Sequence, residues 1–137
     1  MQNTFLLVMT AGAVITDLKE QKIKNKWIFL WILIGLGMKS WNGGIAGFFL
    51  SLGGILVPVL IFWGAFLTRK IGAGDIKLFS AVGSFLGISS ILECMMAAMV
   101  TGAVLGLLKR FLCGKKTTIH LSVPILISVF CRIGGIY

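Results

Sequence analysis

Acidic side chains are scarce in this sequence. The chain of 137 residues has four of them, against 13 lysines and arginines, which gives a net charge of +9. Only 12% of the residues are charged, 58% are hydrophobic, and the mean hydropathy is +1.02. So little charge excludes an ordinary soluble domain and indicates an integral membrane protein with lipid as its surroundings.

Paired cysteines and clustered histidines are missing too. The three cysteines, Cys94, Cys113 and Cys131, form no CxxC pair, and His120 is the single histidine, so we expect neither a metal nor a cofactor. The basic residues lack the interleaved aromatic side chains of a nucleic-acid-binding surface, so we expect no nucleic-acid partner. Residues 1–15 lack the positive n-region and cleavage site of a signal peptide, which predicts a retained first span.

Long apolar stretches, in contrast, fill most of the chain. A membrane-spanning helix needs about 20 apolar residues, within a range of about 17 to 25. We count six stretches as candidate spans, over residues 3–17, 27–41, 43–67, 75–89, 91–108 and 118–137. The first two are short, so either their helices continue into the flanks that carry lysines or they cross a thinned region of the membrane. We therefore predict an all-α fold, a polytopic bundle of about six transmembrane helices, which forms a single membrane-embedded domain over residues 1–137 because no internal repeat or long linker divides it.

The distribution of lysine and arginine predicts the orientation of this bundle. Basic residues near span ends stay on the cytoplasmic side of a membrane. With six spans, eleven of the 13 basic residues fall on one side, namely Lys19, Lys22, Lys24, Lys26, Arg69, Lys70, Lys77, Lys109, Arg110, Lys115 and Lys116. Lys39 and Arg132 fall on the other. We therefore predict a multi-pass protein of the cytoplasmic membrane with both termini outside.

Two of the scarce acids, Asp17 and Asp75, reach the same membrane boundary in this topology. Asp17 ends the first span and Asp75 begins the fourth, so both are predicted at the cytoplasmic boundary. An ionisable side chain at membrane depth costs at least about 2.5 kcal/mol, which makes each a functional candidate. Two carboxyl groups that share a site repel each other, so one stays protonated while the other activates water. Hydrolysis of a peptide bond needs this division of roles.

Glycines and a lysine surround the second aspartate. Gly72 and Gly74 precede Asp75, and glycine both permits backbone angles that other residues avoid and leaves room for an extended substrate. Lys77 is either a substrate contact that also favours ionisation of Asp75 or a lysine that extends to the membrane surface. Gly83 and Gly87 have the spacing of helix-packing contacts inside the bundle, although such a face also fits a homo-oligomer.

Simple structural roles for the acids are the alternative. Asp75 is suited to be the N-cap of the fourth span, and Asp17 is suited to pair with Lys19 or another loop lysine. Neither role explains why both acids fall at one boundary. Glu20 belongs to a charged, solvated loop in this interpretation, and Glu93 marks the outer boundary.

Two blocks around the aspartates resemble a known family. Residues 72–78 read GAGDIKL, and the helix after them has small and apolar residues at Ala81, Gly83, Phe85, Leu86 and Gly87. Asp17-Leu18 is followed by a basic loop that contains Ile23 and Asn25. This pair of blocks resembles the type IV prepilin peptidases, membrane aspartyl proteases with a GxGD motif. Lys24 stands where that family usually has proline, which changes the stiffness of the loop but removes no reacting group.

The resemblance implies a function for the whole chain. Asp17 and Asp75 would be the catalytic pair of an aspartic endopeptidase that removes a short basic leader from prepilin-like proteins, just before their hydrophobic N-terminal helix. Many bacterial members carry a further cytoplasmic region with paired CxxC motifs and methylate the new amino terminus. This sequence lacks that region, so we expect a short form that acts as a peptidase without methyltransferase activity.

Two other classes of function compete with this hypothesis. A small proton-coupled transporter needs an acid near the membrane midplane, whereas both aspartates are predicted at span ends. A membrane scaffold held together by glycine faces would use the aspartates only as dispensable caps. Substitution of the aspartates separates these alternatives from the peptidase.

Overall fold

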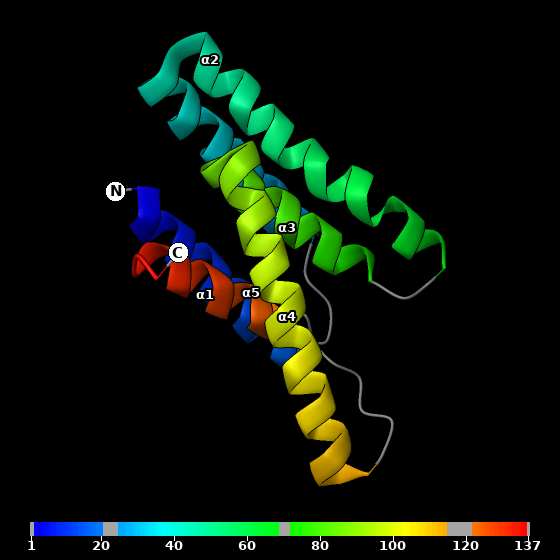
Figure 1. The fold of residues 1–137 in the computed structure, drawn as a ribbon. Helices are drawn as coiled ribbons and strands as arrows, with labels where there is room; N and C mark the ends of the chain where they lie inside the picture. Colours follow the sequence, from blue (N-terminus) through cyan, green and yellow to red (C-terminus); the bar gives the residue numbers. More distant parts are fainter. Residues whose placement is uncertain (1, 21–24, 69–71, 115–121, 137) are drawn as a thin grey trace.

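The computed structural model describes residues 2–20, 25–68, 72–114 and 122–136. These residues form five helices and, within the described ranges, no strand; the helices are α1 (Gln2–Glu20), α2 (Asn25–Leu67), α3 (Ala73–Leu86), α4 (Ile88–Cys113) and α5 (Ser122–Ile133). Figure 1 shows them as one bundle. The prediction of an all-α fold is confirmed. Among the described helices, α2 and α4 are long and apolar enough to cross a membrane.

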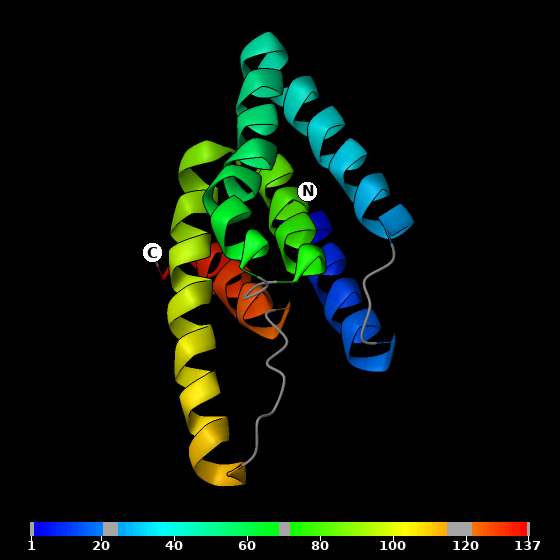
Figure 2. The same ribbon diagram turned by 90° about the vertical axis from the view of Figure 1, so that its right-hand side faces the viewer.

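Helix α2 is bent back on itself at Gly44. This residue has φ 58° and ψ −143°, a conformation with positive φ that glycine adopts more readily than residues with a side chain. Figures 1 and 2 show that the chain reverses at this point, so that α2 has a first limb, residues 25–43, and a second limb, residues 45–67. The predicted apolar stretch 27–41 lies in the first limb, and the stretch 43–67 covers the bend and the second limb.

The boundary between α3 and α4 differs from the sequence prediction. It lies at Gly87, not between residues 89 and 91, and α4 continues to Cys113 beyond the predicted end at residue 108. Gly87 has φ 86°, and its N–H donates a hydrogen bond to the carbonyl oxygen of Gly83 at 2.8 Å. A glycine with positive φ ends α3 there. The last predicted span, 118–137, contains α5, and residues 118–121 and 137 lie outside the described residues.

Small residues bring the second limb of α2 against α3. A side chain on Gly83 would begin 1.9 Å from the carbonyl oxygen of Gly54, and one on Gly54 would begin 2.2 Å from that of Gly83. The Ser51 hydroxyl donates a hydrogen bond to the Ser84 carbonyl oxygen at 2.7 Å. In lipid, helices associate through such close packing and hydrogen bonds, because the lipid tails are as apolar as the side chains. Gly83 therefore packs within the chain, as predicted.

The core lies where α3 meets its neighbours. Nearly all of α3 from Ile76 to Phe85 is buried, and the other buried apolar residues of α1, α4 and α5 include Leu6, Met9, Ala13, Ile91, Cys94, Ile125 and Val129. Large apolar side chains also cover the outside of the bundle, among them Phe29, Phe49, Leu60 and Trp63. An apolar exterior of this kind marks a surface for lipid or for another apolar partner.

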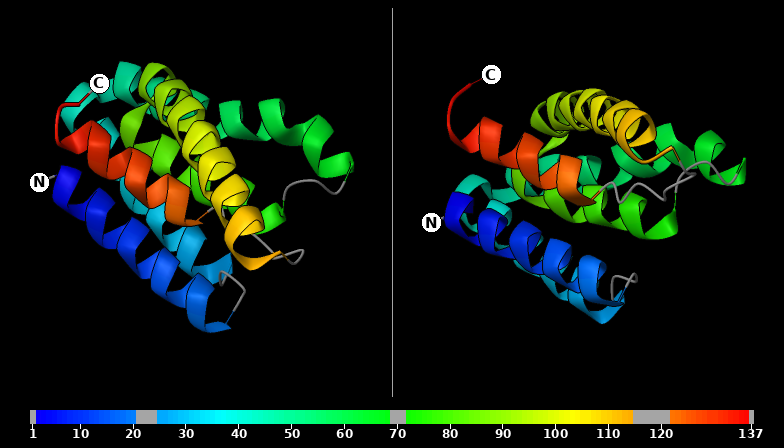
Figure 3. Two further views of the ribbon diagram at one scale, coloured as in Figure 1. Left: turned by 60° about the horizontal axis from the view of Figure 1, so that its bottom comes forward. Right: turned by 90° about the horizontal axis from the view of Figure 1, so that it is seen from below.

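Both chain termini lie at one end of the bundle, together with the bend of α2 (Figures 1 and 3). At this end the Lys39 ammonium donates hydrogen bonds to the carbonyl oxygens of Phe85 at 3.2 Å and Leu86 at 3.0 Å, which stabilises the C-terminus of α3. An ion pair between Arg132 and Glu93 joins α5 to α4. We call this the terminal end, and it holds the two basic residues that the sequence assigns to the outer side.

Candidate active site

Asp17 lies in the last turn of α1 on the buried face of the helix. It continues a row of buried residues, Leu6, Met9 and Ala13, at helical spacing, whereas the next residue, Leu18, is exposed. The side chain of Asp17 is 7% exposed, and its Oδ2 accepts a hydrogen bond from the Ser122 hydroxyl at 2.5 Å. A buried carboxyl group needs such a partner, because burying an amide or hydroxyl group without a hydrogen bond already costs roughly 2 to 7 kcal/mol, and burying an isolated carboxylate costs far more.

Ser122 is the residue of this site that sequence reasoning missed. It is the first residue of α5 and is fully buried, at 0% exposed. Lys19, the partner suggested for Asp17 on simple electrostatic grounds, lies on the exposed side of α1, and helix residues two apart do not face each other. The predicted topology could have indicated Ser122. The sixth predicted span begins near residue 118, at the same membrane boundary where the first span ends with Asp17.

Asp75 is the third residue of α3. The N-cap of this helix is Gly72, without a side-chain cap, and the N–H groups of Asp75 and Ile76 donate to the Gly72 carbonyl oxygen at 3.2 Å and 3.4 Å. The interpretation of Asp75 as the N-cap is therefore wrong. Its partly buried side chain folds back toward Gly72, and a carboxylate in a first turn is stabilised by the helix dipole.

The two glycines before Asp75 have ordinary backbone conformations. Gly72 has φ −73° and ψ 145°, and Gly74, inside α3, is not among the glycines with positive φ. The prediction that they supply unusual backbone angles is wrong, because residues with side chains adopt these angles too. The room around them does fit the prediction. Among the described residues, no heavy atom outside Gly74, its chain neighbours and the nearby backbone of its helix lies within 4 Å of the point where a side chain on Gly74 would begin. The surface beside Asp75 is open there.

The two aspartates lie at the same end of the bundle, opposite the terminal end. Asp17 is near the end of α1 and Asp75 at the beginning of α3, and Figures 1 and 3 show both helix ends on this side. Helices α1 and α3 pack against each other, and α5, which begins with Ser122, packs against both. We call this the aspartate end. Several basic or polar residues predicted near it lie outside the described residues, namely Lys22, Lys24, Arg69, Lys70, Lys115, Lys116 and His120.

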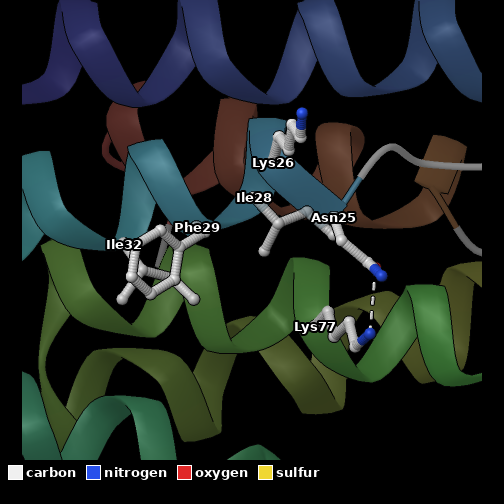
Figure 4. Close-up of a pocket in the computed structure, with 6 residues that line it drawn as sticks. All are labelled: Asn25, Lys26, Ile28, Phe29, Ile32 and Lys77. Atoms are coloured by element: carbon white, nitrogen blue, oxygen red, sulfur yellow. Dashed lines mark hydrogen bonds between the residues drawn. The ribbon is translucent and has the colours of Figure 1, made fainter.

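Lys77 lies two residues beyond Asp75 and faces the first limb of α2. Its ammonium donates a hydrogen bond to the Asn25 side-chain oxygen at 2.9 Å. Figure 4 shows this pair at the edge of an open groove between α2 and α3. The groove has a volume of about 440 Å³ and is lined by Asn25, Lys26, Ile28, Phe29, Ile32 and Lys77. Lys77 is thus positioned by α2, the helix that packs most extensively on α3.

These features define an all-helical membrane protein with a buried carboxyl group at one end of its bundle. Comparison with known proteins then identifies the family, because the family model of the type IV leader peptidases matches residues 4–107. The chain belongs to this family, as the resemblance of its two aspartate blocks predicts. The matched range contains Asp17 and Asp75 but ends before α5 and Ser122.

A curated relative supports the same assignment. The chain is 27% identical over 139 residues to the prepilin leader peptidase/N-methyltransferase of Pectobacterium carotovorum subsp. carotovorum. The match covers 98% of this chain and 47% of the relative, so the chain spans about half the length of that protein. No solved structure matches.

Proposed function

We propose that this protein is an aspartic endopeptidase that removes the leader from prepilin-like precursors. Asp17 and Asp75 are the catalytic pair, and the bond they cut joins a short basic leader to the hydrophobic N-terminal helix of the precursor. The observation that carries the proposal is the buried Asp17 carboxyl group, bound to Ser122, at the end of the bundle where Asp75 begins α3. The family and the named activity of the curated relative support it.

The proposed site lies at the cytoplasmic boundary of the cytoplasmic membrane. The five helices supply six helical segments, because α2 has two limbs, and each segment corresponds to one apolar stretch of the sequence. Lys19, Lys26, Lys77, Lys109 and Arg110 belong to helix ends on the side of the two aspartates. Basic residues favour the cytoplasmic side, so this charge distribution supports a multi-pass protein with its termini outside.

The proposed reaction is hydrolysis by a pair of carboxyl groups that share one proton. The ionised carboxylate takes a proton from a water molecule as the water oxygen attacks the carbonyl carbon of the peptide bond. The protonated carboxyl group donates its proton to the leaving nitrogen as the carbon–nitrogen bond breaks. The open surface beside Gly74 leaves room for an extended segment of substrate to approach Asp75. A helical segment is less suitable as substrate, because its peptide groups are hydrogen-bonded within the helix.

Ser122 holds the Asp17 carboxyl group in this proposal. Replacement of Ser122 with alanine removes the hydroxyl group that donates to Oδ2 at 2.5 Å. A hydrogen bond to a charged group is worth about 1.5 to 3 kcal/mol, so we expect kcat to fall by about 10 to 100-fold, with KM little changed because Ser122 is buried away from substrate. Steady-state kinetics of leader removal measure both constants.

Ser128 provides the matched control for this variant. It is a buried serine of the same helix, and its hydroxyl donates to the Ile125 carbonyl oxygen. We expect Ser128→Ala to keep kcat within about threefold of wild type, and Ser122→Thr, which retains the hydroxyl group, to recover most of the activity lost in Ser122→Ala. Equal losses in Ser122→Ala and Ser128→Ala would contradict a positioning role for Ser122.

Reconstituted protein tests the proposed function directly. The purified chain in lipid vesicles is mixed with a precursor that carries a basic leader before an apolar helix, and mass spectrometry follows the precursor. We expect a product whose mass corresponds to loss of the leader at the junction. A precursor that stays intact in the presence of folded protein would overturn the proposal.

The transporter alternative has no support from the positions of the acids. All four acidic residues are described, and they lie near helix ends: Asp17 and Glu20 in the last turns of α1, Asp75 in the first turn of α3, and Glu93 in the second turn of α4. A proton-coupled site is expected near the membrane midplane. The scaffold alternative predicts that substitutions of Asp17 and Asp75 leave the function of the protein unchanged.

A further inference from the structure

We propose that the groove between the first limb of α2 and the start of α3 binds one anionic phospholipid. The phosphate of the headgroup lies at Lys77 and Asn25, and the upper part of an acyl chain lies along Phe29 and Ile32. This inference does not rest on peptidase activity, because it concerns a different face of α3 and a different ligand.

The polar end of the groove carries a positive charge that the protein does not neutralise there. Lys77 donates to the side-chain oxygen of Asn25, which is a neutral partner, and within the described ranges it forms no ion pair. The lysine ammonium and the Asn25 amide group both retain N–H donors beyond this bond. A second cation, Lys26, also lines the groove, although its side chain extends away from the pair (Figure 4). None of the described residues that line the groove is acidic. An anion is therefore the matching ligand.

The rest of the groove is apolar and lies deeper along α2. Ile28, Phe29 and Ile32 follow Asn25 along the helix, and Figure 4 shows Phe29 and Ile32 together at the end away from Lys77. Ile32 lies seven positions beyond Asn25 on the helix, which corresponds to about 10 Å at 1.5 Å per residue. A ligand that fits both ends has a charged head and an apolar part of about this length. Free phosphate matches only the polar end.

The groove opens toward the lipid side of the bundle. Phe29 is 64% exposed, and Leu30 and Leu33 on the same limb are 52% and 50% exposed. In the proposed orientation these side chains contact the bilayer, and the polar end of the groove lies at the cytoplasmic surface, where anionic lipids attract basic residues. A substrate with a basic leader suits the groove less well, because Lys26 and Lys77 repel the positive charge of the leader.

Lipid titration of the full chain tests this inference. Native mass spectrometry of the protein in detergent measures binding of phosphatidylglycerol, phosphatidylcholine and inorganic phosphate. We expect phosphatidylglycerol to bind more tightly than phosphatidylcholine, and Lys77→Gln to weaken its binding by about fivefold, the effect expected for one lysine near an anionic lipid. Glutamine at this position keeps a hydrogen-bond donor for Asn25, so the fold is retained. Phe29→Ala should also weaken binding.

Control variants and competing ligands define the results that would contradict the proposed lipid site. Lys109 is an exposed lysine of α4 outside the groove, and Lys109→Gln should leave binding of phosphatidylglycerol unchanged. Asp75→Asn should also bind the lipid as wild type does, which separates this inference from the peptidase. Equal binding of the two lipids, equal losses in Lys77→Gln and Lys109→Gln, or tighter binding of inorganic phosphate would overturn it. Displacement of the lipid by a peptide with a basic leader and an apolar segment would instead assign the groove to substrate.

Discussion

Asp17→Asn and Asp75→Asn are each expected to lower kcat for leader removal by about 10² to 10⁴-fold, the contribution that a positioned acid or base makes. Asparagine has nearly the size of aspartate but neither accepts a proton from water nor donates one to the leaving nitrogen. Both carboxyl groups are needed in one catalytic cycle, so the double variant should be little slower than either single variant. The rate of product formation in reconstituted vesicles measures all three.

Glu20 supplies the control for these variants. It is an exposed acid three residues beyond Asp17 on the same helix, so Glu20→Gln makes the same change in charge outside the site. We expect its kcat to stay within about twofold of wild type, as for most surface substitutions away from a site. In Asp17→Asn the asparagine oxygen still accepts the hydrogen bond from Ser122, so a native thermal melting curve should accompany the loss of activity. A wild-type rate in either aspartate variant would exclude the catalytic pair.

Gly83→Val is expected to have the largest effect on stability. Its first side-chain atom would lie 1.9 Å from the Gly54 carbonyl oxygen, which belongs to backbone and has little freedom to move. Helix α3 would have to separate from the second limb of α2, which also strains the hydrogen bond from Ser51 to Ser84. Overpacking typically costs about 1 to 3 kcal/mol, and we expect the upper end of this range or more. Denaturant titration in detergent measures the free energy of unfolding.

Gly64 is the matched position on α2. Apart from Gly64 itself, its chain neighbours and the nearby backbone of its helix, no heavy atom of the described part of the chain lies within 4 Å of the point where a side chain on Gly64 would begin. Gly64→Ala should therefore leave the free energy of unfolding unchanged or raise it by up to about 1 kcal/mol, the difference in helix propensity between alanine and glycine. If Gly83→Val and Gly64→Ala had the same small effect, the close approach of α2 and α3 would not contribute to stability.

Hydropathy predicted the fold more closely than it predicted the ends of its helices. An apolar stretch of the sequence corresponds to every helical segment of the described residues, and α2 and α4 are long and apolar enough to cross a membrane. The sequence predicts the break between α3 and α4 after Ser89, whereas the chain turns at Gly87. Many glycines in this sequence sit in helices without positive φ, so the residue type alone does not reveal which glycine ends a helix.

The aspartates were visible in the sequence because acids are rare there and because basic residues indicate the side on which spans end. Ser122 was not visible, because its contact with Asp17 joins residues 105 positions apart and depends on how α5 packs against α1. The unusual backbone angles predicted at Gly72 are not found, for a related reason. Glycine permits unusual backbone angles but does not require them, and the angles of Gly72 are ordinary. The open surface at Gly74 is what distinguishes this turn.

The contact between α1 and α5 also sets an order of events during synthesis. Asp17 leaves the ribosome 105 residues before Ser122, the hydroxyl group that binds its carboxylate. Until α5 joins the bundle, Asp17 in the nascent chain lacks its hydrogen-bond donor, Ser122. In the proposed peptidase, the hydrogen bond that holds Asp17 therefore forms only after α5 has packed against α1.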